Sequence, residues 1–280
     1  MGSLFGAVLR ISVPYVLGAL GGVWSERAGV IAIGLEGMLL TSAFTATLGA
    51  YFTHSALLGL LAGVAGGALL AALYALLVLR FRGDQIVCGV ALNLFADGST
   101  RFLLKSLFGS SSNSPVIGAW GQLAVPLVAA TVLLVLGSQL LLGRTRFGLR
   151  VRAVGEHPEA AASLGVSVAG VRWPAVLLGG ALAGLGGAWL AADQHQFVAG
   201  MSNGRGYIAL AALIFGGWRP RSAALAGLLF GFAEAGQIAL QAAGVGLPGW
   251  SIQMLPYVLT MVALASAMRR GSAPAALGKP

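Results

Sequence analysis

The sequence has almost no cysteine and few acidic residues. Its one cysteine, Cys88, lies in an apolar run, which excludes an internal disulfide and a zinc site built from cysteines. Asp and Glu number 8 against 17 Lys and Arg, and charged residues make up only 9% of the 280 residues. Because 58% of the chain is hydrophobic, it could not stay soluble without lipid around it.

Catalytic and nucleotide-binding motifs are also missing. The sequence contains no zincin, P-loop, nucleophile-elbow or dinucleotide-binding pattern, and no acid pair, metal-ligand set or nucleophile with a base can be assembled. We therefore expect no catalytic residue, no metal and no cofactor of its own. If nucleotide hydrolysis powers this protein, a partner subunit must bind the ATP.

The basic residues do not indicate nucleic-acid binding, although the net charge is +9. They cluster in short loops beside apolar segments, as the membrane-insertion bias predicts, and they form no basic face with interleaved aromatics. The expected surroundings are membrane lipid.

Apolar segments of about twenty residues recur along the chain and predict a polytopic membrane protein. We expect an all-α transmembrane helical bundle of about eight to ten spans, forming one domain over residues 1–270, followed by a disordered tail at 271–280. The nine candidate crossings are 4–23, 30–52, 55–79, 85–107, 124–142, 173–192, 205–218, 222–242 and 251–268.

The arginines predict which loops are cytoplasmic. By the count of crossings they fall on one side, and the loops 109–122 and 244–250 on the other side carry no charge. The carboxyl end is then cytoplasmic and the amino end lies outside. The orienting arginines are Arg80, Arg82, Arg144, Arg146, Arg150, Arg152, Arg219, Arg221, Arg269 and Arg270.

Two segments are poor helix candidates. Residues 27–40 hold three glycines and a glutamate, and 204–218 is short with glycines at both ends, so both are predicted to be interrupted spans. Both contain Arg, then Gly or Ala, then Ile-Ala, which would suit inverted repeats whose unwound segments meet near mid-membrane. The alternative is that the glycines only let helices pack closely.

Polar residues inside apolar spans need a reason, because burying them in lipid is costly. Asn93, Asp97 and Arg101 share one helical face, on which Asp97 and Arg101 can form an ion pair. Such polar residues could line a passage for a polar solute. The alternative is that they form buried interhelical pairs, and for Glu36 the partner could be Arg27. The candidate pathway residues are Glu36, Phe44, Asn93, Phe95, Asp97, Glu234 and Gln237, with Phe44 or Phe95 as the ring that would stack on a flat solute near Asn93.

The polar stretch 143–172 is predicted to be a water-exposed loop of about thirty residues that serves as a docking surface. We expect a small amphipathic helix in it. Pro158 suits its first turn, Glu159 suits the positive end, and Gly165 ends it.

Three stretches, at 21–40, 152–166 and 206–220, resemble the signature stretches of permease subunits of ABC importers for branched-chain amino acids, simple sugars and nucleosides, and are most similar to the nucleoside type. One departure is Ala32, where that pattern usually has asparagine. The resemblance implies an inner-membrane protein whose helix at 156–164 docks on a cytoplasmic ATPase, the coupling residues being Gly155, Glu156, His157, Pro158, Glu159, Ala160, Ala161, Leu164 and Gly165.

The resemblance further implies three partners: cytoplasmic ATP-binding subunits, a second and homologous permease chain, and an extracytoplasmic substrate-binding lipoprotein. ATP-driven closure of the ATPase pair would then move the coupling helix and switch access across the membrane. The alternative is a secondary transporter with Glu36, Asp97 or Glu234 as its proton carrier.

Overall fold

A computed structural model describes residues 2–118, 120, 124–243, 254, 258, 261 and 273–279. Apart from three residues, the predicted crossing at 251–268 lies outside these ranges, as do Arg269 and Arg270. Ten α-helices and one π-helical turn make up the described chain: α1 (Gly2–Arg27), α2 (Leu35–Thr53), α3 (Ala56–Ala75), η1 (Leu76–Arg80), α4 (Gln85–Phe108), α5 (Ala124–Arg144), α6 (Arg146–Glu156), α7 (Pro158–Ser163), α8 (Val168–Gln194), α9 (Arg205–Phe215) and α10 (Pro220–Ala242).

The predicted fold class is confirmed. Six helices are long and apolar enough to cross a membrane: α1, α3 with η1, α4, α5, α8 and α10. The 19-residue α2 and the 11-residue α9 accompany them. Within the described ranges the extended segments form no strand, only the isolated bridge between Asn113 and Val198.

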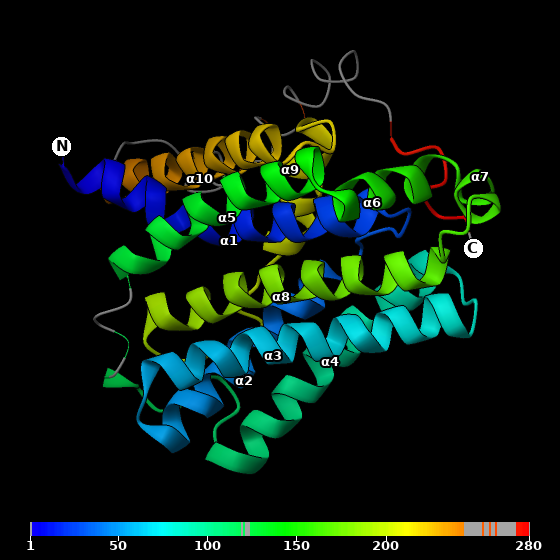
Figure 1. Ribbon diagram of the computed structural model, residues 1–280. Coiled ribbons are helices and arrows are strands. Elements are labelled where there is room, and N and C mark those ends of the chain that lie inside the picture. Colours follow the sequence, from blue (N-terminus) through cyan, green and yellow to red (C-terminus); the bar gives the residue numbers. More distant parts are fainter. Residues whose placement is uncertain are drawn as a thin grey trace.

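The long helices α1, α3, α5, α8 and α10 run side by side in one bundle, and α4 leans away from it at an angle (Figure 1). In their most apolar stretches α1 and α8 are 67% and 78% buried, so they form the centre, whereas α5 is only 22% buried there. Small residues allow α3 and α8 to approach closely: a Cβ at Gly67 would lie 2.6 Å from Gly184 Cα. This contact supports the packing interpretation of part of the glycine content.

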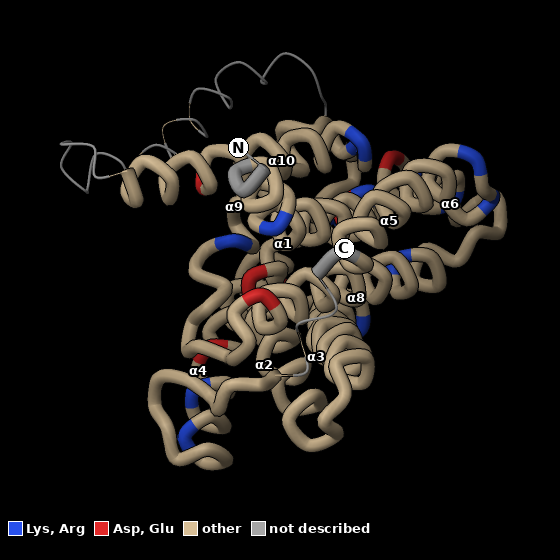
Figure 2. The backbone as a smooth tube through the Cα atoms, turned by 90° about the vertical axis from the view of Figure 1, so that its left-hand side faces the viewer, with Lys and Arg blue, Asp and Glu red and all other residues tan. Residues whose placement is uncertain are grey.

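Several helices begin or end with an arginine at the same end of the bundle. We call this end the basic end. Arg27, Arg80 and Arg144 end α1, η1 and α5, and Arg219 is the N-cap of α10. These helix ends lie to the right in Figure 1, and Figure 2 shows basic residues beside α6 on an otherwise mostly uncharged tube. Arg10 lies at the opposite end, where it pairs with Asp193 of α8.

Two expectations about polar segments need correction. The stretch 143–172 is not one long loop, because α6 and α7 fill most of it. Residues 273–279 of the expected disordered tail are folded against the basic end, where Pro274 and Ala276 are buried. The physical reason in both cases is apolar burial: Val151 and Val154 of α6 belong to the core, and Leu277 packs against the same cluster.

Both interrupted spans are present. Residues 28–34 are non-helical between α1 and α2, and residues 195–204 are non-helical before the short α9. The two breaks meet through hydrogen bonds described below. The shared pattern does not occupy equivalent structure, however, because residues 28–32 are non-helical whereas residues 205–209 are helical.

Candidate coupling site and central polar cluster

The α6–α7 unit, residues 146–163, is shaped by its local sequence. The Thr145 hydroxyl accepts a hydrogen bond from Gly148 N at 3.1 Å and caps α6. Val151 and Val154 turn inward, and Phe147 stacks on Trp24 of α1 with ring centroids 5.9 Å apart. An amphipathic helix of this kind lies on the basic end of the bundle and shows its polar side outward.

α7 confirms the small helix predicted from the sequence. Pro158 stands in its first turn, and Gly165, with φ +80°, follows its C-cap. Ala161 is buried, whereas Leu164 is 84% exposed. The remaining exposed coupling candidates around it are Glu156, His157, Glu159, Ala160 and Gly165.

The turn between α6 and α7 touches the end of α1. Gly155 is buried so close to Arg27 that a Cβ there would overlap the Arg27 carbonyl oxygen. Arg27 Nη1 lies 4.0 Å from Glu156 Oε1, and Arg27 Nε donates to the Trp218 carbonyl at 2.8 Å. Arg27 therefore joins α1 to both the α6–α7 unit and the loop after α9, rather than pairing with Glu36.

The end of α1, the α6–α7 unit and the loop after α9 thus meet at one place, which we call the junction. Glu26 belongs to its buried part, since only 3% of this residue is exposed. Its carboxylate accepts from Ala32 N at 3.1 Å and from Trp218 Nε1 at 2.6 Å. Residues from the three stretches at 21–40, 152–166 and 206–220 thus meet at the basic end. The side chains Glu26, Arg27 and Trp218 and the backbone of Gly155 make the contacts.

The non-helical backbone at 28–34 is satisfied by side chains of neighbouring helices, as backbone at membrane depth must be. These side chains come from α1, α3, α4 and α8, so the break is a fixed part of the bundle. The bonds are Ser25 Oγ to Val30 O (3.0 Å), Tyr74 Oη to Ile31 O (2.7 Å), Ile31 N to Gln85 Oε1 (2.8 Å), Asn93 Nδ2 to Ile33 O (2.9 Å) and Arg172 Nε to Ala28 O (3.1 Å).

Glu36 holds the two breaks together. Its carboxylate accepts from Gly204 N at 2.8 Å and from Gly206 N at 2.7 Å. These amides open α9, so the negative charge lies at the positive end of that helix dipole. A side chain at Gly206 would overlap the Glu36 backbone, which explains why glycine stands there.

Asn93 is a second link in this central polar cluster. Its Oδ1 accepts from Gly37 N at 2.8 Å, and its Nδ2 also donates to Tyr207 Oη at 3.1 Å. Only 8% of Asn93 is exposed, so the amide is largely used in joining α4 to α2 and α9. Tyr207 of α9, by contrast, is 48% exposed.

Glu234 forms an interhelical ion pair. Arg205 Nη2 lies 2.7 Å from Glu234 Oε1, and the Tyr15 hydroxyl donates to the other carboxylate oxygen. Both charged side chains are about four-fifths buried, at 18% and 20% exposure. The pair joins α9 to α10 and α1, and Gln237, one turn further along α10, is half-buried.

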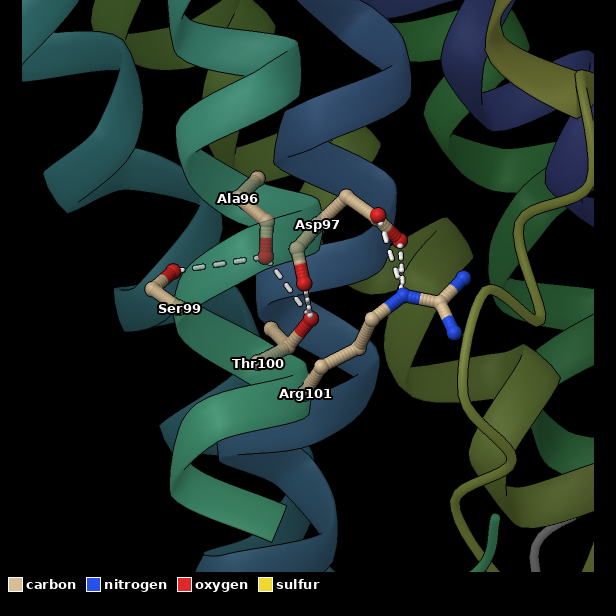
Figure 3. A network of polar contacts seen from close by, with 5 residues as sticks. All are labelled: Ala96, Asp97, Ser99, Thr100 and Arg101. Atoms are coloured by element: carbon tan, nitrogen blue, oxygen red, sulfur yellow. Dashed lines mark hydrogen bonds and ion pairs between the residues drawn. The ribbon is translucent and has the colours of Figure 1, made fainter. Parts of the chain in front are cut away.

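The predicted ion pair on α4 is confirmed. Arg101 Nε donates to both Asp97 oxygens, at 2.9 and 3.0 Å, and the Thr100 hydroxyl donates to the Ala96 and Asp97 carbonyls (Figure 3). Unlike the Arg205–Glu234 pair, both charged side chains are about half exposed, at 52% and 45%. The pair lies near the middle of a span-length helix.

The two phenylalanines lie apart from Asn93. Phe44 is 2% exposed and packs edge-on against Phe197 with centroids 5.1 Å apart, inside the core. Phe95 is 58% exposed but points away from Asn93, because side chains two residues apart on a helix do not share a face.

Sequence reasoning did not single out Tyr207, Glu26 or Arg172. Glu26 lies within the stretch 21–40. A carboxylate beside an interrupted span could have been predicted to accept hydrogen bonds from the free backbone amides of that interruption. Tyr207 and Arg172 carried no such signal, because their partners are remote in sequence.

A helical bundle with apolar helices of span length, non-helical segments at 28–34 and 195–204 and a short exposed helix, α7, is the architecture of a polytopic membrane protein. The chain belongs to the family described as branched-chain amino acid transport system permease component, which matches residues 4–264.

Among curated proteins, the chain is similar to the guanosine ABC transporter permease protein NupQ of Bacillus subtilis, with 38% identity over 98% of this chain and 94% of that protein. The nucleoside ABC transporter permease protein NupC of Lactococcus lactis is 38% identical over 97% and 94%. A putative glucose ABC transporter permease protein, TsgC13 of Haloferax volcanii, is 34% identical over 87% and 79%. No solved structure matches.

Proposed function

We propose that this permease is the membrane subunit of an ATP-driven importer that carries a nucleoside across a bacterial-type inner membrane. The observation that carries the proposal is the Gly155–Arg27 contact. The exposed α6–α7 unit there touches the end of α1, directly before the break at 28–34. A force applied to α7 would therefore reach the broken span without passing through the rest of the bundle.

The family and the exposed α7 support the proposed partners. A cytoplasmic ATP-binding subunit would seat on α7, whose Leu164 offers an apolar contact, while a substrate-binding lipoprotein would deliver the solute at the opposite end. The basic end would then be the cytoplasmic one, as the distribution of positive charges favours. The chain itself would hydrolyse no ATP.

A second permease chain is supported by α4. An ion pair that is half exposed near the middle of a membrane helix would be costly against lipid, so water or another protein must cover it. We propose that the Asp97–Arg101 face borders the solute passage between two permease chains.

Nucleoside is favoured as the solute because two similar proteins are named for guanosine or nucleoside, at 38% identity, against 34% for the one named for glucose. Tyr207 is the aromatic ring best placed to stack on a base, because Asn93 holds its hydroxyl and half of it is exposed. We do not assign that role to Phe44, which is inside the core.

The test is to co-express the permease with its ATP-binding subunits, purify the complex in detergent and measure uptake in vesicles with a panel of guanosine, adenosine, glucose and leucine. The proposal predicts a stable complex and uptake of labelled guanosine that nucleosides inhibit. A complex that transports only glucose or leucine would refute the solute, and absence of any bound ATPase would refute the importer.

A further inference from the structure

Residues 273–279 form a short extended and turned segment that lies against the junction at the basic end (Figure 1). Ala276 N donates to the Gly155 carbonyl at 2.9 Å, and Gly278 N donates to the Gly29 carbonyl at 3.1 Å. Ala275 N donates to Glu156 Oε2 at 3.2 Å. The segment is therefore bonded both to the α6–α7 unit and to the break after α1.

The segment is also packed rather than laid on the surface. Ala276 is 1% exposed, and Leu277 packs against the cluster that contains Val154 and Ala28. Next to it, Gln85 at the start of α4 donates to the Lys279 carbonyl at 3.5 Å and accepts from Ile31 N at 2.8 Å. The α6–α7 unit, the break at 28–34 and the start of α4 thus all contact residues 273–279.

These contacts fall on the residues through which the docking unit reaches the broken span. Gly155 offers its backbone to both partners: its carbonyl accepts from Ala276, and its missing side chain lets Arg27 approach. Glu156 likewise lies beside both Arg27 and Ala275. Movement of α6–α7 relative to 28–34 would have to break the segment's bonds or carry the segment along.

We propose that residues 273–279 are a clasp that fixes the α6–α7 unit to residues 28–34, so that displacement of the docking helix by ATPase subunits is transmitted to the broken span. The clasp is a positioning element and touches no solute. This inference rests on the proposed importer function.

Two variants test the clasp in the complex reconstituted with its ATP-binding subunits: Ala276→Pro, which removes the amide bonded to Gly155, and a chain ending at Ser272. The matched control is Ala273→Pro, at an exposed position of the same segment. We expect guanosine transported per ATP hydrolysed to fall about fivefold in Ala276→Pro, as loss of one net hydrogen bond would give. The ratio should fall further in the shortened chain, which loses every contact of the segment, and stay unchanged in the control.

An unchanged ratio in both variants would overturn the clasp. A spin label on Leu277→Cys, whose half-buried side chain packs against the core, supplies a second measurement in a Cys88→Ser background of the full chain should the variants fail to assemble. A strongly immobilised spectrum is expected, and a freely mobile one would overturn the proposal. A full-length complex whose ATPase drives no uptake would refute the importer function instead, while the label would still report whether the segment is docked.

Discussion

Single residues at the basic end hold together segments that are far apart in sequence. Gly155 is the clearest case, because any side chain there would overlap the Arg27 carbonyl. Gly143, on the same polar stretch, has nothing within 4 Å of a Cβ and provides a matched control.

Gly155→Val should therefore push α6 away from α1. Overpacking of this kind costs about 1–3 kcal/mol. We expect the bundle to remain folded, while guanosine uptake driven by ATP falls several-fold and ATP hydrolysis continues. Uptake and hydrolysis measured on one vesicle preparation check this, with Gly143→Val unchanged. Parental coupling in Gly155→Val would show that the contact transmits nothing.

Glu36 stabilises the meeting of the two breaks through charge-assisted bonds to Gly204 N and Gly206 N. Glu36→Gln removes the charge and leaves one acceptor oxygen, so we expect a loss of about 1–2 kcal/mol in unfolding free energy. Thermal unfolding in detergent should show a lower midpoint for Glu36→Gln and none of this loss for the exposed Glu159→Gln. Equal midpoints for the two variants would contradict the assigned role.

At the scale of residues, the sequence predicted the pair whose members are close in sequence and missed the pairs whose members are remote. Asp97 and Arg101 are four residues apart, so helical geometry alone brings them together. Glu36 and Gly204 are separated by 168 positions, and no periodicity indicates such a partner. The expectation that Arg27 reaches Glu36 failed for the same reason.

Among the elements, α7 with its C-cap Leu164 is the surface on which we propose that an ATP-binding subunit seats. Leu164→Asp places a charge where an apolar contact is proposed, and it should weaken co-purification of the ATP-binding subunits about tenfold, the equivalent of about 1.4 kcal/mol. The control is Val116→Asp, which is 73% exposed and lies in the loop between α4 and α5. Undiminished binding by Leu164→Asp would exclude α7 as the seat.

The exposed face of α4 gives a prediction about water. Asp97→Cys should react with a membrane-impermeant thiol reagent in a Cys88→Ser background, because we propose that this half-exposed face borders the water-filled solute passage. Leu133→Cys on α5, where Leu133 is 68% exposed among apolar neighbours, should react slowly because lipid covers it. Similar slow labelling at both positions would contradict a passage beside α4.

Element prediction succeeded where one signal dominated. Apolar length identified the long helices, and Pro158 with Gly165 bounded α7 correctly. The helix α6 was missed, because its three arginines were taken as the sign of a loop and the inward Val151 and Val154 were not counted as a buried face. Residues 273–279 were missed because their order depends on contacts with Gly29 and Gly155.

At the scale of the whole molecule, composition alone was sufficient for the class of a helical membrane protein. What the sequence could not reveal is that the stretches at 21–40, 152–166 and 206–220 come together at one end, since that depends on how the helices are ordered in space. On the proposed importer function, this convergence would give the ATP-binding subunits a short route to the break at 28–34. Each candidate proton carrier is paired: Glu36 with amides, Asp97 with Arg101 and Glu234 with Arg205.

The most direct test of this account is the energy source of uptake. Vesicles containing the permease, its ATP-binding subunits and its binding protein would be loaded with ATP, and labelled guanosine uptake would be measured with and without a protonophore. The account predicts uptake that requires the ATP-binding subunits and persists when the proton gradient is collapsed. Uptake that proceeds without those subunits and stops when the protonophore is added would contradict it.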